Sequence, residues 1–167
     1  MQISSDNEVE ILQADLADPV HGQAIVELLN DYSSHLMGGG SPLSDPVLEA
    51  LIPRLVAHPT SLILLARLQQ RFIGIAVCFM GFSTFNAKPL LNIHDLGVLG
   101  GFRGKGVGRK LLAAVEEKAR RLGCCKITLE VREDNARARG LYTREGFGFP
   151  GGEDETEVRY LYQEKRL

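Results

Sequence analysis

A glycine-rich, basic segment separates an apolar run at 96–99 from an amphipathic stretch at 107–122. Its sequence is Arg103-Gly104-Lys105-Gly106-Val107-Gly108. Glycines keep a turn free of side chains, so several backbone N–H groups can converge on one anion. The positive N-terminal end of the following helix favours the same anion. The segment therefore predicts a phosphate-binding turn, the alternative being a glycine-rich turn whose basic residues are only solvated.

Two common phosphate loops do not match this segment. A Walker loop needs Ser or Thr after its lysine, and here Gly106 follows Lys105. A dinucleotide fingerprint needs G-x-G-x-x-G, whereas these glycines alternate and neither register supplies the third one. The pattern Arg-x-x-Gly-x-Gly does match, and it resembles the pyrophosphate loop of the GNAT family of N-acetyltransferases, which bind acetyl-coenzyme A.

A second segment strengthens the resemblance. Asn135, Ala138 and Tyr142 are spaced i, i+3 and i+7, so they share one face of a predicted helix, and Gly146-Phe147 follows closely. Asp134 or Asn135 can cap the start of that helix, and Gly146 is placed to end it in a left-handed conformation. This order is similar to the other GNAT signature, Asn-x-x-Ala-x-x-x-Tyr followed by Gly-Phe. The alternative for Tyr142 is a half-buried core tyrosine.

The apolar periodicity divides the rest of the chain into strands and helices. We expect strands at 8–14, 61–68, 72–82, 90–99, 125–131, 147–149 and 156–164. We expect helices at 19–35, 43–57 (broken or kinked at Pro53), 107–122 and from Asn135 onward. The resemblance implies an α/β (α+β) GNAT fold in one domain, 1–167. Its mixed, mostly antiparallel seven-stranded sheet would be splayed between strands 4 and 5, with helices on both faces.

Composition excludes several functional classes. A chain of 167 residues can bury a sizeable core. The net charge of −2 argues against nonspecific nucleic-acid binding, and no apolar stretch is long enough to span a membrane. The N-terminus has no signal pattern, so we expect a cytoplasmic protein. The three cysteines have neither disulfide nor metal-ligand spacing, so no metal is expected.

Acetyl transfer to an amine sets clear chemical demands. A lysine-like amine has a pKa near 10.4, so at pH 7 only about one in a few thousand is neutral and nucleophilic. The enzyme must therefore accept a proton, stabilise an oxyanion and assist the leaving thiolate.

In the resembling family these roles lie at the gap between the fourth and fifth strands. The resemblance assigns backbone contacts with acetyl-CoA to the end of the fourth strand, with the Val98 N–H as the oxyanion donor, and makes Tyr142 the general acid. The expected cofactor-binding residues are Leu96, Gly97, Val98, Arg103, Gly104, Lys105, Gly106, Val107, Gly108, Arg109, Asn135, Ala138 and Tyr142.

The proton acceptor is left open between His94, Asp95 and a water. The runs 82–89 and 93–96 resemble the diamine and polyamine acetyltransferases, which usually have Glu where this chain has His94. Histidine exchanges protons near neutral pH, and Asp95 would attract a cationic acceptor. On a regular strand His94, Leu96 and Val98 share one face and Asp95 the other, unless a bulge alters this. The alternative for His94 is a strand histidine bonded only to backbone.

The acceptor is expected near the first two helices, with Asp31, Tyr32 and His35 as candidate substrate contacts. The alternative for these three residues is ordinary helix surface and core packing. The sequence thus favours an acetyl-CoA-dependent N-acetyltransferase that acts on a primary amine of a small molecule (diamine, polyamine or amino-acid-like) by direct attack in a ternary complex. Acetylation of a protein N-terminus or lysine is one alternative, and a non-catalytic acyl-CoA-binding regulatory module is another. A homodimer is compatible with the resemblance, and neither nucleic acid nor membrane is an expected partner.

Overall fold

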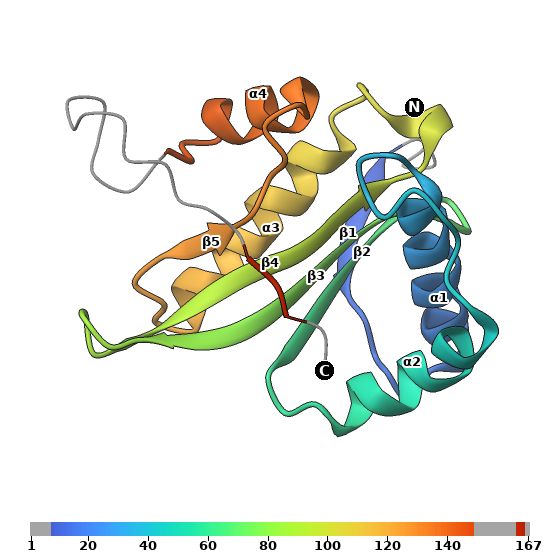
Figure 1. Cartoon of the computed structure of the whole chain (residues 1–167), viewed down its shortest axis with the longest axis horizontal. Helices are drawn as coiled ribbons and strands as arrows, with labels where there is room; N and C mark the ends of the chain where they lie inside the picture. Colours follow the sequence, from blue (N-terminus) through green and yellow to red (C-terminus); the bar gives the residue numbers. More distant parts are fainter. Residues whose placement is uncertain (1–7, 149–162, 166–167) are drawn as a thin grey trace, which may run out of the picture.

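The computed structural model describes residues 8–148 and 163–165 as a five-stranded sheet with helices on both faces (Figure 1). The strands are β1 (Val9–Gln13), β2 (Ser61–Leu68), β3 (Arg71–Ser83), β4 (Lys88–Val98) and β5 (Ile127–Leu129). The helices are α1 (Pro19–Ser34), α2 (Asp45–Ala57), the 3-10 turn Gly100–Phe102, α3 (Val107–Arg121) and α4 (Ala136–Arg144). The strands lie in the order β1-β2-β3-β4-β5; neighbours are antiparallel except β4 and β5, which are parallel. No helix in the described ranges is long and apolar enough to cross a bilayer.

The predicted order of five strands and four helices is confirmed, with some differences at the ends. The helix α2 continues through Pro53 without a break, and β5 is shorter than the predicted 125–131. Phe147 is not in a strand. Gly148 is described and is not in a strand either, whereas Phe149 and the predicted seventh strand up to residue 162 lie outside the described residues. Gln163 and Glu164 are described and form no strand. The described sheet therefore has five strands, and the seven-stranded sheet is not confirmed.

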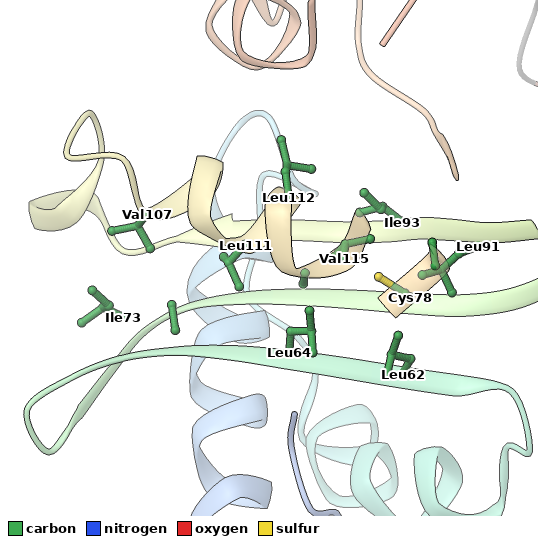
Figure 2. Close-up of a cluster of buried hydrophobic side chains, with 13 residues drawn as sticks. Leu62, Leu64, Ile73, Cys78, Leu91, Ile93, Val107, Leu111, Leu112 and Val115 are labelled. Carbon is green, nitrogen blue, oxygen red and sulfur yellow. The ribbon is translucent and has the colours of Figure 1, made fainter. Parts of the chain in front are cut away.

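Two hydrophobic cores explain why the central strands are apolar on both faces. Alternate residues of β2 point to opposite sides, so Leu62 and Leu64 pack toward α3 while Ile63 and Leu65 pack toward α1 and α2. Figure 2 shows the first core, where side chains of α3 meet those of β2, β3 and β4. The sheet thus packs between helices on both of its faces, and pairing with β3 holds β4 in place.

The β4 strand leaves its β5 neighbour halfway along its length. Pairing with β5 covers only Leu91 to Ile93, whereas β4 continues to Val98. In the described part of the chain, β4 residues beyond Ile93 therefore pair with β3 alone. The predicted gap between the fourth and fifth strands is present, and it begins at His94.

A β-bulge occurs at the same point. Cys78 pairs with Ile93 and the preceding Val77 pairs with Asp95, so His94 is the extra residue opposite no β3 partner. Beyond the bulge Asp95 lies opposite Val77, whose side chain belongs to the α1 core. Leu96 instead packs with the α3 core. The alternation expected for a regular strand therefore fails at His94.

The close approach of α3 to the sheet depends on a glycine in β3. A Cβ built on Gly74 would lie 3.2 Å from each of three atoms: the Gly97 carbonyl oxygen, Leu111 Cδ1 and Val107 Cγ1. One of these contacts is backbone of β4, which cannot rotate away. Gly74 thus sets the spacing between the sheet, the first turn of α3 and the end of β4.

We predict that Gly74→Ala lowers the free energy of unfolding by about 1–3 kcal/mol, because the added methyl group overpacks this junction. Urea unfolding followed by circular dichroism measures the change. Gly100→Ala is the control, since a Cβ there would meet nothing within 4 Å. Equal stability of the two variants would contradict the account of this junction.

Candidate functional site

The glycine-rich segment forms the predicted turn before α3. Gly104 and Gly106 have φ of 78° and 84°, a left-handed conformation that side-chain-bearing residues rarely adopt. Gly106 is the N-cap of α3, so no side chain caps the helix, and the first-turn N–H groups have no intrahelical acceptors. Such a turn presents backbone donors and a positive helix end to an anion, so it fits a phosphate group.

The basic side chains around this turn have different partners. Arg103 donates from Nε to the Val98 carbonyl oxygen at 2.7 Å, which ties the turn to the end of β4. Lys105 Nζ lies 5.6 Å from the centroid of the Phe102 ring. Arg109 pairs with Glu145 just beyond α4, with 3.3 Å between Nε and Oε1. Of these expected cofactor contacts, Lys105 makes no ion pair with a described residue, while Arg109 is partly engaged in linking α3 to α4.

The end of β4 presents backbone groups away from β3. The Leu99 N–H donates to the Ile73 carbonyl oxygen at 3.0 Å, so it points toward β3. Because backbone groups alternate along a strand, the Leu96 and Val98 amides point to the opposite edge, where β5 no longer pairs. These two residues were expected to offer backbone contacts, and their place at the open edge agrees with that expectation.

Asp95 and Tyr32 meet on the α1 side of this strand. A Cβ built on Gly97 would lie 3.3 Å from Tyr32 Cβ, so the tyrosine packs directly on the β4 backbone. Burial raises the pKa of Asp95, although the neighbouring His94 lowers it. Burial, and then the Asp95 carboxylate, raise the pKa of Tyr32. The structure thus brings together a half-buried carboxylate from β4 and a phenol from α1.

Tyr142 is held by the C-terminal cap of α4. The Gly146 N–H donates to the Thr143 carbonyl and the Phe147 N–H to the Tyr142 carbonyl, with Gly146 at φ 84°, which is a Schellman cap. The Phe147 ring lies 5.8 Å from the Tyr142 ring. Burial raises the pKa of Tyr142 to about 12, and the Tyr32 phenol adds to the rise. The predicted left-handed cap at Gly146 is confirmed, and it fixes the residue expected to be the acid.

His94 lies on the same side as Asp95, in a row of rings that the sequence did not indicate. The Phe79 ring is 5.6 Å from the His94 ring and 4.9 Å from the His58 ring, both in edge-on contacts. His94 is exposed, whereas Asp95 is half-buried. His58 follows α2, Phe79 belongs to β3 and His94 to β4, so only the tertiary fold could have shown this grouping.

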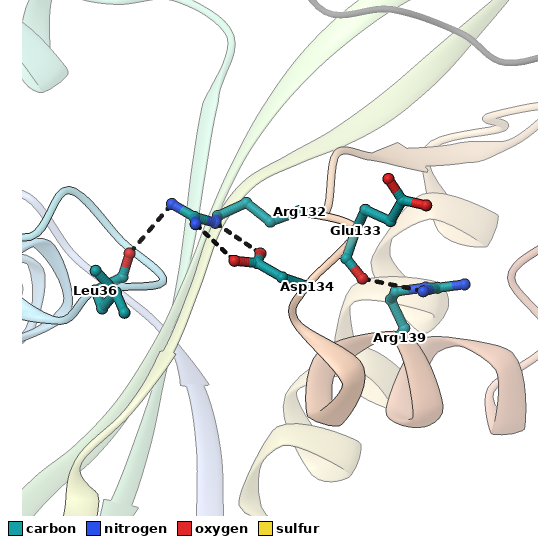
Figure 3. A network of polar contacts seen from close by, with 5 residues as sticks. All are labelled: Leu36, Arg132, Glu133, Asp134 and Arg139. Atoms are coloured by element: carbon teal, nitrogen blue, oxygen red, sulfur yellow. Dashed lines mark hydrogen bonds and ion pairs between the residues drawn. The ribbon is translucent and has the colours of Figure 1, made fainter.

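The remaining predicted residues lie at the end of α1 and at the start of α4. Asp31 and His35 face each other at the end of α1, with 3.6 Å between Oδ2 and Nε2. Asn135 caps α4 by accepting from the Ala138 N–H at 3.1 Å, as its position predicted. Figure 3 shows Arg132 bound to Asp134 and donating to the Leu36 carbonyl oxygen at 3.4 Å. Arg132 therefore links the loop after α1 to the loop before α4.

One charged side chain near the turn was missed by the sequence analysis. Arg137, in the first turn of α4, places Nη2 3.4 Å from the position of a Cβ built on Gly104. Nothing in its sequence position signals this, because the contact depends on how α4 packs over α3. The site as a whole combines an anion-binding turn, an open strand edge, a half-buried carboxylate and a phenol, which suits transfer of a group from a phosphate-bearing donor to a polar acceptor.

Known proteins similar to this chain include acetyltransferases. Residues 23–149 match the model of the acetyltransferase (GNAT) family. The chain is 30% identical over 145 residues to the uncharacterized N-acetyltransferase YhfO of Bacillus subtilis (strain 168), covering 83% of this chain and 89% of that protein.

Solved structures show the same fold. The crystal structure of a probable acetyltransferase has a TM-score of 0.76 at 21% identity, covering 95% of this chain and 99% of the other. The aminoglycoside N-acetyltransferase AAC(6')-Iy in complex with CoA has a TM-score of 0.74 at 18% identity, covering 98% of this chain and 99% of the other.

We predict that Asp95→Asn has a higher free energy of unfolding than the unsubstituted protein, and that this difference grows as pH rises. The folded-state pKa of Asp95 is raised, so folding favours its protonated form. The contribution of Asp95 to the free energy of unfolding is therefore fully present below its pKa in the unfolded chain, near 3.9. That contribution is lost as pH rises through its pKa in the folded protein. The stability gain from Asn should therefore be larger at pH 7 than at pH 3.5.

Urea unfolding at several pH values tests this prediction. Glu49→Gln, at an exposed position of α2, is the matched control. A stability difference for Asp95→Asn that stays constant or shrinks toward neutral pH would show that the carboxylate is not destabilised by burial.

Proposed function

The chain belongs to the GNAT family of acetyltransferases, which use acetyl-CoA, and we propose that it acetylates a primary amine of a small molecule by direct attack in a ternary complex. The observation that carries the proposal is the meeting of Asp95, Tyr32 and Tyr142 beside the edge of β4 that β5 leaves open. Acetyl-CoA supplies the activated acetyl thioester. The protein must bind acetyl-CoA, hold the amine beside it, accept a proton from the amine and provide a hydrogen-bond donor to the leaving thiolate.

The cofactor side of the site is formed by the turn and the strand edge. The left-handed glycines and the uncapped first turn of α3 suit the pyrophosphate. The Leu96 and Val98 amides suit the amide groups of the pantetheine arm, as an added strand would. In this arrangement the Val98 N–H is the donor for the carbonyl oxygen on which negative charge develops. Asn135 and Ala138, at the start of α4, are the other residues that would contact the cofactor.

Asp95 is the residue we assign to the acceptor amine. A half-buried carboxylate beside a phenol attracts a cationic amine, and its raised pKa makes it a better proton acceptor than an ordinary aspartate. His94 is exposed at the bulge next to it, on the same side of the sheet, and provides a route for the proton to solvent. Asp31 and His35 lie at the end of the helix that carries Tyr32, so they suit the outer part of the acceptor.

Tyr142 is the residue we assign to the leaving thiolate. With a pKa of about 12, its hydroxyl stays protonated across the physiological range and remains a hydrogen-bond donor. A thiol has a pKa near 8.5, so this phenol is a much weaker acid than the group it faces. Tyr142 therefore stabilises the departing sulfur by hydrogen bonding and does not have to transfer its proton completely.

A small-molecule acceptor is supported by the chemistry of the site and by a structural neighbour. The negative groups near the open edge, Asp95 and Asp31, favour an amine that is cationic in solution. The neighbour AAC(6')-Iy is named as an aminoglycoside N-acetyltransferase, and aminoglycosides are small molecules with several amines. Diamines, polyamines and amino-acid-like amines share that feature, so all of these belong in the test.

We predict that acetyl-CoA releases free thiol in the presence of one class of small amines, and that Tyr142→Phe lowers kcat about 10- to 100-fold. The phenylalanine keeps the ring packing on Phe147 and removes only the hydrogen-bond donor. A thiol-reactive dye measures release against diamines, polyamines, amino acids, aminoglycosides and short peptides.

Thr143→Ala, at an exposed neighbouring position of α4, is the control and should leave kcat within about twofold. Thiol release with peptides alone would show that the acceptor is a protein and not a small molecule. Binding of CoA without release for any acceptor would contradict the enzymatic proposal.

A further inference from the structure

Arg137 is a cationic side chain that α4 places over the turn between β4 and α3. Its Nη2 atom lies 3.4 Å from the position of a Cβ built on Gly104, the first left-handed glycine of that turn. The two residues are far apart in sequence, and they meet because α4 packs beside the N-terminal turn of α3. A Cβ built on Gly108 would lie 3.2 Å from Leu141 Cδ2, which shows the same close packing one turn later.

The neighbouring arginines already have partners. Arg103 donates to the Val98 carbonyl oxygen, and Arg109 pairs with Glu145. On α4 itself, Arg139 donates to the Glu133 carbonyl oxygen at 3.0 Å (Figure 3). The side chain of Arg137 makes no hydrogen bond or ion pair within residues 8–148 and 163–165. Its guanidinium is therefore available to a ligand at the turn, and planar guanidinium groups bind phosphates through paired N–H donors.

The helix α4 is held to the rest of the protein by few contacts. None of its nine residues is buried. Leu141 and Tyr142, in its last turn, pack against the core beside α3, and Leu141 also lies against Gly108. The ion pair of Arg109 with Glu145 adds a further link, and its Arg109 side chain is 74% exposed. An exposed ion pair contributes little to stability. A helix with so few buried contacts opens more easily than the core, so a bound ligand can change its stability.

We propose that Arg137 binds the diphosphate of coenzyme A at the 103–108 turn and, by doing so, fixes α4 and the Tyr142 side chain that it carries. The inference rests on the proposed function, since it assumes that acetyl-CoA occupies the turn. Arg137 lies in the first turn of α4 and Tyr142 in the last. Leu141 and Tyr142 pack the C-terminal end of the helix against the core, so a contact of Arg137 with the diphosphate adds an anchor at the N-terminal end. Binding energy from a remote, non-reacting part of the donor is then used to orient a group at the reacting sulfur.

The first test compares CoA binding by three variants, measured by isothermal titration calorimetry. Arg137→Gln should raise the Kd of CoA about tenfold or more, because a charge-assisted contact with phosphate is lost. Arg137→Lys should retain part of that affinity. Arg139→Gln removes the same charge from the same helix and should change Kd less than threefold. Equal losses of CoA affinity in Arg137→Gln and Arg139→Gln would show that Arg137 acts only through the general charge of the surface, and would overturn the proposal. An unchanged Kd in Arg137→Gln would overturn it as well.

The second test measures the stability of α4 by hydrogen exchange of the backbone amides at 136–144. CoA should slow exchange in the unsubstituted protein and in Arg139→Gln, but not in Arg137→Gln at a CoA concentration that saturates it. Equal protection in Arg137→Gln would contradict the positioning role. Faster exchange of α4 in Arg137→Gln without CoA would show that Arg137 only stabilises the fold. Failure of the unsubstituted protein to bind CoA would instead overturn the proposed function itself.

Discussion

The early end of pairing between β4 and β5 is the constraint on which the rest of the site depends. A sheet that stayed closed would use the backbone groups of Leu96 and Val98 internally, and nothing could bind there. The strand is nevertheless kept rigid, because β3 pairs with it to its end and Gly74 lets α3 pack closely across it. A well-supported strand with one open edge is a preformed binding surface, which lowers the entropic cost of holding an extended ligand.

The bulge at His94 determines which groups face that surface. One extra residue moves Asp95 to the α1 side, where Tyr32 packs on Gly97, and leaves Leu96 on the α3 side. The Asp95 carboxylate therefore lies on one face of the strand, while the backbone amides proposed to bind the cofactor lie along its open edge. On our proposal this separates acceptor chemistry from donor binding, while the Schellman cap at Gly146 brings Tyr142 to the region between them.

Much of this arrangement was readable in the sequence, for reasons that are local. The glycine turn, the cap at Asn135 and the left-handed Gly146 depend on backbone conformations that few residue types favour, so their positions were predictable. A bulge in this strand was considered from the resemblance, but its position at His94 was not predicted, because that position follows from pairing with β3 and not from the strand's own residues. The rings of His58 and Phe79 beside His94, and the place of Arg137, were missed for the same reason, since each joins elements distant in the chain.

The most direct test of the account is a crystal structure with CoA bound. The account predicts that the pantetheine amides pair with Leu96 and Val98 along the open edge of β4. It also places the diphosphate on the turn at 103–108 and the sulfur within hydrogen-bond distance of the Tyr142 hydroxyl. Coenzyme bound elsewhere, or lying across the turn with its sulfur remote from Tyr142 and Asp95, would contradict the claim that this open strand edge is the catalytic centre.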